Sequence, residues 1–341
     1  MNVFDKFFKK FSYKFDKGYP DMNNEQDVLL LESILDELNI DLFTIPIKEE
    51  TKGKATLFEA ALVVAWYKLN KKEIPQGAVP QKDFEALDDK MIEDAEKILK
   101  KSGLTGGESA YQLGSSSESL TSFWKEHGAT NTTPKTDLVI DGKKISLKVG
   151  PSQLMSGAGN ELTATFYAAL KNSPNTQKEI VDDIANSIKD VFVRGTTKAG
   201  NVRQAKKAGD DPILNKAVDE MGVLKREIEK LLETDPTFKT EFAYEAATGA
   251  QKFGGNEGTA DHVLAISSNY SDGKLHPITK EYASKIADKM KLDINMKSGS
   301  QKIKGIKTGK YNYYSVLRAG LEDLFKDASD DIGINNDIDF N

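Results

Sequence analysis

A short segment near the middle of the chain carries an acid, a hydroxyl and a lysine at spacings suited to phosphate chemistry. We interpret TDLVIDGKKISLKV as a β-hairpin whose two-residue turn is Asp141-Gly142, because Asp-Gly between alternating runs is a strong hairpin signal. In that register Asp137 faces Ser146, and Lys148 lies two residues further along the same face. A carboxylate binds Mg²⁺, which activates water and polarises a phosphate, and a lysine orients that water or stabilises the transition state. The segment therefore predicts part of a metal-dependent phosphodiesterase site.

The other face of the same hairpin is apolar, as packing against a helix requires. Leu138, Ile140, Ile145 and Leu147 all fall on it in the predicted register. The polar side chains are thus confined to one face. One carboxylate is not enough to hold the metal, and Ser146 is a weak neutral ligand, so we expect a second acid from elsewhere in the chain.

The second acid is suggested by a resemblance. The chain reads PKTD, then SLK, then twelve residues, then Glu161. This order resembles the restriction endonucleases of the PD-(D/E)XK superfamily whose pattern is PD, (S/T)XK and a glutamate displaced onto the following helix. The resemblance covers about residues 105–171, and it departs from the pattern because Lys135 and Thr136 separate Pro134 from Asp137.

The resemblance implies a function and a role for each matching residue. It implies a DNA endonuclease with a restriction-endonuclease-like fold, in which Asp137 and Glu161 bind Mg²⁺, Lys148 acts on the nucleophile or transition state, and Ser146 supports the site. Glu108, which we expect in an upstream helix, is a candidate ligand for a second metal ion. Cleavage of both strands would favour a homodimer, because two equivalent sites address two antiparallel strands.

Two lysine-rich segments are candidates for contact with nucleic acid. One holds five lysines without an acid and is followed by tyrosines, a combination suited to phosphate contact and base stacking. Its candidate binding residues are Lys297, Lys302, Lys304, Lys307, Lys310 and Tyr313. The other is a Gly-containing loop with Arg194, Lys198, Arg203, Lys206 and Lys207. Each is also compatible with an ordinary solvated loop.

The segment EAATGAQKFGG, residues 245–255, has a turn-rich end and precedes a predicted strand. Glu245 and Lys252 either line the same cleft as the hairpin residues or belong to a simple helix terminus.

Composition limits the kinds of site that the chain can build. The 341 residues include no cysteine and three histidines, which disfavours disulfides, thiolate chemistry and transition-metal centres, so we expect a hard ion held by carboxylates. No apolar run approaches the roughly 20 residues that span a bilayer, so we expect a cytoplasmic protein without a membrane partner. The net charge of −6 disfavours indiscriminate binding of nucleic acid and leaves local basic patches to bind it.

The spacing of apolar residues predicts an α/β protein with a mixed sheet flanked by helices and a helical N-terminal region. We expect helices at 24–39, 55–70, 84–101, in a Ser-rich stretch ending at SFWKEHG, and at 161–171, 176–193, 213–233, 278–291 and 312–328. We expect strands at 261–267 and 292–297 besides the hairpin, and no regular element at 150–160. The predicted organisation is a helical region at 1–102, a nuclease-like domain at 103–327 and an acidic tail at 328–341.

A second functional class fits the same sequence. A lysine-rich, cysteine-free chain with many short helices and an acidic end is also typical of a bacteriophage virion or assembly protein. In that case the nuclease-like fold would contact DNA without cleaving it, and the protein would reside in the host cytoplasm or the virion.

Overall fold

The computed structural model describes residues 49–113, 118–197, 212–298, 311–321 and 324. The chain divides into two compact units, Met1–Ala55 and Thr56–Asn341. Except for the first residues of helix α3, which begins at Glu49, the features described below belong to the second unit. The predicted helix at 24–39 and the acidic tail at 328–341 lie outside the described residues.

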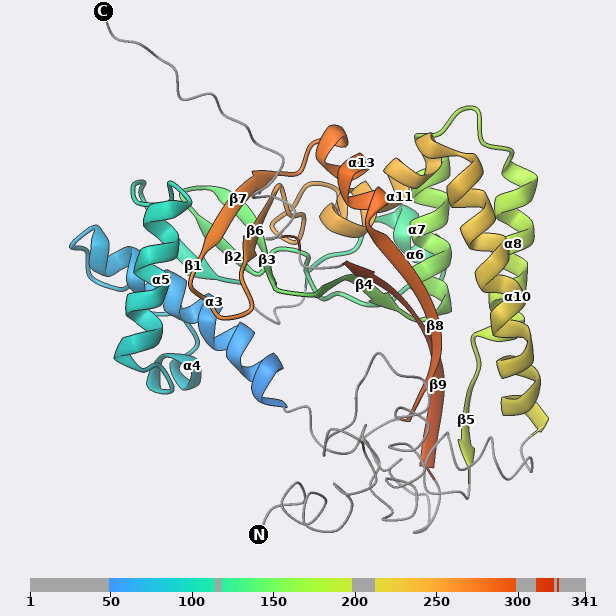
Figure 1. The fold of residues 1–341 in the computed structure, drawn as a ribbon, viewed down its shortest axis with the longest axis horizontal. Coiled ribbons are helices and arrows are strands. Elements are labelled where there is room, and N and C mark those ends of the chain that lie inside the picture. Colours follow the sequence, from blue (N-terminus) through green and yellow to red (C-terminus); the bar gives the residue numbers. More distant parts are fainter. Residues whose placement is uncertain (1–48, 114–117, 198–211, 299–310, 322–323, 325–341) are drawn as a thin grey trace, which may run out of the picture. The chain divides into compact units, whose positions relative to one another are not determined.

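Helices and strands are interspersed along the second unit (Figure 1). The helices are α3 (Glu49–Leu69), α4 (Gln81–Glu85), α5 (Asp89–Lys101), α6 (Ser122–Glu126), α7 (Gly159–Lys171), α8 (Lys178–Val191), α10 (Pro212–Thr234), α11 (Pro236–Thr248), α12 (Ala250–Phe253) and α13 (Lys280–Asp288). The strands are β1 (Ala110–Gln112), β2 (Leu138–Ile140), β3 (Lys143–Val149), β4 (Ser152–Gly157), β5 (Arg194–Thr197), β6 (His262–Ile266), β7 (Gly273–Pro277), β8 (Met290–Ser298) and β9 (Tyr311–Leu321).

The first sheet is mixed, as predicted. Its strand order is β1-β2-β3-β6-β7, and β3 and β6 are parallel while every other neighbouring pair is antiparallel. The parallel pair needs a long connection, and the chain between β3 and β6 supplies it with the helices α7 to α12 and two strands of a second sheet.

The β2–β3 hairpin has the predicted register. Ile140 pairs with Lys143 and Leu138 pairs with Ile145, so the turn consists of Asp141 and Gly142. Both turn residues have positive φ, 51° and 73°, as a two-residue turn of this kind requires. The four apolar residues predicted for one face are all buried, with 8% exposure or less.

Helices cover both faces of this sheet. On one face α3 and α5 pack on the apolar side of the hairpin, in a core that contains Trp66, Ile98 and Leu138. On the other face Val263 and Ala265 join a second core built mainly by α7, α8, α10, α11 and the second sheet. The sheet therefore lies between two hydrophobic layers, with the hairpin contributing to the first and β6 to both.

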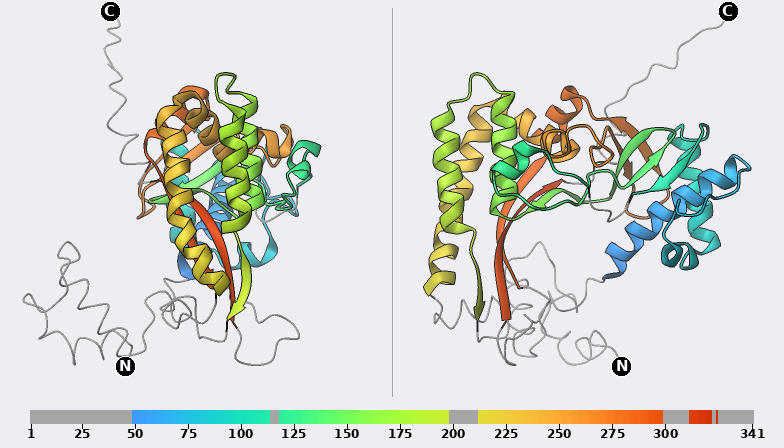
Figure 2. Two further views of the ribbon diagram at one scale, coloured as in Figure 1. Left: turned by 90° about the vertical axis from the view of Figure 1, so that its right-hand side faces the viewer. Right: turned by 180° about the vertical axis from the view of Figure 1, so that it is seen from behind.

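The second sheet is organised around β9. This strand pairs with β8 along one edge, and with β4 and β5 on successive parts of the other. Helices α8 and α10 lie side by side (Figure 2), and α10 packs against β8. The side chains of Leu317, Ala319 and Leu321 alternate along β9 into the second core.

Most predicted elements are confirmed, and several predictions are wrong. Helices α3, α7, α8, α10 and α13 and strands β6 and β8 fall where the spacing predicts them, whereas the region 84–101 is split between the end of α4 and α5. The predicted helix at 312–328 is wrong over its first part, which forms strand β9. Apolar residues in this segment recur at every second position as well as at helical spacing, so the pattern fits either element.

Residues 152–157, which we expected to be irregular, form β4, because an antiparallel partner far along the chain satisfies their backbone. The Ser-rich helix is also shorter than predicted. Only Ser122–Glu126 are helical there, and Ala110–Gln112 form β1.

Among the described helices, none combines the length and apolar character needed to cross a membrane.

Candidate functional site

Asp137 immediately precedes β2 and is held by the facing strand. Its Oδ2 atom accepts a 2.6 Å hydrogen bond from the backbone N–H of Leu147 and a 3.3 Å hydrogen bond from the Ser146 hydroxyl. The backbone N–H of Asp137 donates to the Ile145 carbonyl. The hairpin thus fixes the carboxylate beside Ser146, as the predicted register requires.

Lys148 lies two residues beyond Ser146 on β3 and acts on Asp137 electrostatically. Burial raises the pKa of Asp137, and the charge of Lys148 is the largest of the effects that lower it. Among the described residues the two groups form no direct ion pair. The arrangement keeps an ammonium group near the carboxylate without neutralising it by contact.

A second carboxylate near Asp137 comes from α3 and was not predicted. Glu59 is only 8% exposed, and its Oε2 atom accepts a 2.9 Å hydrogen bond from Gln112 on β1. Burial, followed by the charge of Asp137, raises the pKa of Glu59 to about 8, and the charge of Lys148 lowers it. Glu59, Asp137 and Lys148 therefore share one electrostatic environment.

Each of the two carboxylates keeps one oxygen available. In the part of the chain that the structure describes, Oδ1 of Asp137 and Oε1 of Glu59 accept no hydrogen bond. Two coupled carboxylates with available oxygens suit a hard divalent cation. No group of three or more carboxylate or histidine side chains suited to a metal occurs among the described residues, so water and substrate oxygens would complete the coordination.

Glu161 lies in the first turn of α7, as predicted, but its contacts are with another set of residues. Its Oε2 atom accepts a 3.0 Å hydrogen bond from the indole N–H of Trp124 and lies 3.5 Å from Nζ of Lys252. Its Oε1 atom accepts a 2.9 Å hydrogen bond from the backbone N–H of Asn131. Among the described residues no hydrogen bond or ion pair joins Glu161 to Asp137 or Lys148.

Glu108 lies at the turn end of the hairpin rather than in a helix. It is exposed, in the bend before β1, and its backbone N–H donates to Oδ1 of Asp141. Asp141 is in the β2–β3 turn, and Asp137 precedes the opposite end of β2. The expected helical placement of Glu108 is wrong, because the chain after α5 becomes β1 instead of a helix.

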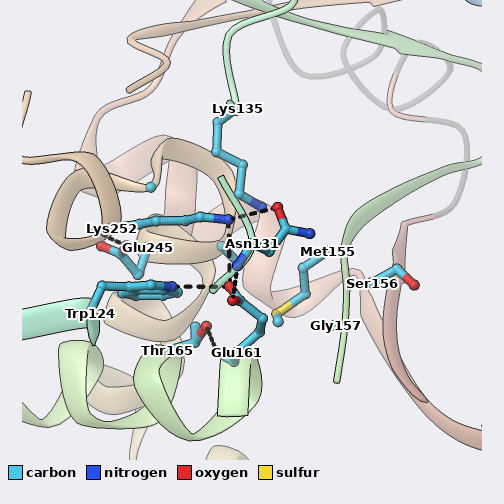
Figure 3. A pocket seen from close by; sticks show the side chains of 12 residues that line it. Trp124, Asn131, Lys135, Met155, Ser156, Gly157, Glu161, Thr165, Glu245 and Lys252 are labelled. Carbon is cyan, nitrogen blue, oxygen red and sulfur yellow. Dashed lines mark hydrogen bonds and ion pairs between the residues drawn. The ribbon is translucent and has the colours of Figure 1, made fainter. Parts of the chain in front are cut away.

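Next to the hairpin residues is a polar cavity of about 50 Å³ (Figure 3). Its lining comes from α6, the loop before β2, β4, α7, α11 and α12. The lining residues are Trp124, Asn131, Lys135, Met155, Ser156, Gly157, Glu161, Thr165, Glu245, Ala246, Gly249 and Lys252. Glu245 and Lys252 line this cavity together, but Asp137, Ser146 and Lys148 are not among its lining residues, so a cleft shared with the hairpin residues stays a prediction.

Burial controls the ionisation of the charged groups in this cavity. Burial, followed by the charges of Lys252 and Lys148, lowers the pKa of Lys135 to about 7. Burial raises the pKa of Glu245 to about 7, opposed by hydrogen bonds from the backbone N–H groups of Gln251 and Lys252. Lys135 lines the cavity while lying only two residues before Asp137 in the chain.

The basic segments are described only at their ends. Lys297 and Tyr313 lie in β8 and β9, and Arg194 begins β5. The described residues do not include Lys302, Lys304, Lys307 and Lys310, or Lys198, Arg203, Lys206 and Lys207. Thr197 pairs with Tyr311, and Ser298 pairs with Tyr313, so both segments are connected to the same end of the second sheet.

Comparison of the chain with protein-family models, curated proteins and solved structures gives no match. The functional argument therefore depends on the geometry and chemistry of the residues themselves.

Proposed function

We propose that this protein is a Mg²⁺-dependent DNA endonuclease of the PD-(D/E)XK type. The observation that carries the proposal is that Glu59 and Asp137, which each keep one oxygen free of hydrogen bonds from the described residues, lie within electrostatic range of each other and of Lys148. A mixed sheet with helices on both faces is also the architecture that the sequence resemblance implies.

The residues fit a Mg²⁺ ion in number and kind. Asp137 and Glu59 would hold it through the oxygens that accept no hydrogen bond from the described residues. When bound, Mg²⁺ supplies charge stabilisation at the scissile phosphate and lowers the pKa of a coordinated water. In this assignment Glu59 takes the place that the sequence motif gives to Glu161.

The protein side chains contribute position and charge. Ser146 and the Leu147 N–H fix one oxygen of Asp137, so that the other keeps its direction. Lys148 supplies a positive charge beside the reacting phosphate, where it orients the attacking water or stabilises the developing negative charge. Gln112 likewise fixes one oxygen of Glu59 by donating a hydrogen bond to Oε2.

The basic segments attached to the second sheet would supply the phosphate contacts that hold DNA. Nonspecific DNA affinity comes chiefly from such contacts. We propose that the segments around Lys297 and Arg194 act together, since their ends lie on paired strands. A homodimer would present two equivalent sites to the two strands.

Cleavage of supercoiled plasmid tests the proposal. Wild-type protein is compared with Lys148→Ala and with Lys143→Ala, which removes a partly exposed lysine from the same strand and serves as a control. We expect Mg²⁺-dependent nicking or linearisation by the wild type and the control, and none by Lys148→Ala.

Absence of cleavage by wild-type protein in Mg²⁺ and in Mn²⁺ would contradict the proposal. If such a protein still bound DNA, the result would favour the alternative of a bacteriophage virion or assembly protein with a noncatalytic DNA-contacting fold.

A further inference from the structure

The cavity beside the hairpin is lined by two lysine side chains, of which Lys252 is buried and Lys135 is partly buried. Lys252 is 6% exposed, and its Nζ atom lies 3.5 Å from Glu161 Oε2 and 3.4 Å from Asn131 Oδ1. Lys135 Nζ donates a 3.3 Å hydrogen bond to the Leu154 carbonyl. Both polar contacts of Lys252 are long, and its Nζ atom also lies 5.1 Å and 5.9 Å from the ring centroids of Phe253 and Trp124.

The two lysine side chains differ in the partners of their ammonium groups. Glu161 is the one carboxylate within ion-pair distance of either lysine among the described residues. Glu245 directs both of its oxygens to the backbone N–H groups of Gln251 and Lys252. One ammonium group, that of Lys135, therefore has a neutral carbonyl as its described partner.

The beginning of α7 adds a further positive element. Gly157 and Glu161 line the cavity, and α7 starts between them at Gly159 without a side-chain cap on its N-terminus. A helix N-terminus directs backbone N–H groups and a partial positive charge toward whatever lies in front of it. Together with two lysines in one enclosed space, it makes an environment suited to an anion.

We propose that this cavity binds a phosphate monoester, of the kind found at the end of a polynucleotide chain. A cavity of about 50 Å³ holds a few water molecules or one small polar group. A terminal phosphate enters such a space end first, whereas an internal phosphodiester requires a groove open at both ends.

The proposed role of this phosphate rests on the nuclease function above. Lys135 is two residues before Asp137 in the chain and is affected by the charge of Lys148. A terminal phosphate held by Lys135 would therefore anchor the polynucleotide beside the candidate metal site. Such an enzyme would prefer phosphorylated ends and nicks to intact duplex.

Calorimetric titration without Mg²⁺ tests binding apart from cleavage. The ligands are inorganic phosphate, a 5′-phosphorylated oligonucleotide, its 3′-phosphorylated counterpart and the same strand with hydroxyl ends. The proteins are the wild type, Lys252→Met, the pair Lys252→Met with Glu161→Gln, and Lys100→Met on the exposed surface of α5 as a control. The paired variant removes both charges of the ion pair and keeps the interior neutral.

We expect wild-type protein to bind a phosphorylated strand at least about tenfold more tightly than the hydroxyl strand. Lys252→Met and the paired variant should lose that preference, and Lys100→Met should keep it. If the protein binds inorganic phosphate but neither phosphorylated strand, the ligand is a free phosphate and not a polynucleotide end. That result would support the phosphate site and overturn its anchoring role.

If folded wild-type protein binds neither inorganic phosphate nor a phosphorylated strand at up to about 10 mM, the phosphate site is overturned. This result would leave the nuclease proposal standing wherever plasmid cleavage is observed. Conversely, phosphate binding that depends on Lys252 in a protein without cleavage would retain the site and reject the nuclease.

Discussion

The Glu161 carboxylate lies 3.5 Å from the Lys252 ammonium group, and the two side chains are 13% and 7% exposed. Trp124 and Asn131 donate to the same carboxylate. Three donors from separate parts of the chain thus converge on one acid. Glu161 of α7 therefore links α6 and α12 across the cavity through these contacts.

Removing one member of this ion pair should cost more stability than removing both. We expect Lys252→Met to lower the free energy of unfolding by about 2 to 3 kcal/mol, because it leaves a largely buried carboxylate without its cation. Adding Glu161→Gln should recover at least half of that decrease. Urea unfolding of the two variants measures the difference, and equal decreases would show that the pair is not coupled.

The two candidate metal ligands can be distinguished by their glutamine variants. We expect Glu59→Gln to weaken Mg²⁺ binding about tenfold or more and to abolish cleavage, because it removes one of two carboxylates. Glu161→Gln should leave Mg²⁺ affinity within about twofold, because its contacts are with the cavity. Calorimetric titration with Mg²⁺ checks both variants. The opposite ranking would restore Glu161 as the second ligand that the motif implies.

Glu59 should make stability depend on pH. Its pKa is about 8 in the folded protein against an ordinary value of 4.5, so between these values the folded state holds a proton that the unfolded state has released. Its contribution therefore weakens as pH rises, by up to about 1.4 kcal/mol per pH unit. In EDTA, Glu59→Gln should thus gain stability relative to wild type between pH 5.5 and 7.5. A constant difference across this range would contradict the raised pKa.

Two glycine substitutions should have opposite effects. Gly142 has φ of 73° in the hairpin turn, and alanine there should cost about 1 to 2 kcal/mol of stability. Gly222 lies within α10, and a Cβ there would meet its nearest neighbour, Arg226, at 3.7 Å. Gly222→Ala should therefore stabilise the protein by about 0.5 to 1 kcal/mol. Thermal unfolding of the two variants checks both signs.

The lysines of residues 297–310 should control the salt dependence of DNA binding. For duplex DNA, each lysine–phosphate interaction contributes about 0.9 to the steepness of log affinity against log salt. Replacing all five lysines with glutamine should therefore flatten the slope and weaken binding. Replacing Lys90, Lys97, Lys100 and Lys101 of α5 with glutamine provides a charge control of similar size. Equal slopes for both variants would exclude the segment from the DNA surface.

The hairpin could be predicted from sequence because its information is local. Asp141-Gly142 sets the turn, and the register then places Asp137 beside Ser146 by counting. The helix that begins at Gly159 could likewise be predicted, and Glu161 falls in its first turn. What Glu161 contacts could not be predicted, because Trp124, Asn131 and Lys252 approach it from separate parts of the chain.

Glu59 was missed for a related reason. In the sequence it is one acid in an otherwise apolar helical segment, ATLFEAALVVAWY, and its partner Gln112 belongs to a short strand that was also not predicted. An acid in so apolar a stretch is a signal that could have been used, since a buried carboxylate needs a compensating partner. The sheet that brings α3 and Asp137 together is what reveals it.

The central position of β9 in the second sheet has a consequence for biosynthesis. Ser152 of β4 is paired with Leu321, and β5 and β8 depend on the same strand. While the chain emerges from a ribosome, α7, α8 and α10 therefore expose part of their apolar surface until residue 321 has been released. Contacts between such distant residues also slow folding. The newly made chain would spend this interval prone to aggregation and dependent on chaperones, although the hairpin and its acidic site could already be in place.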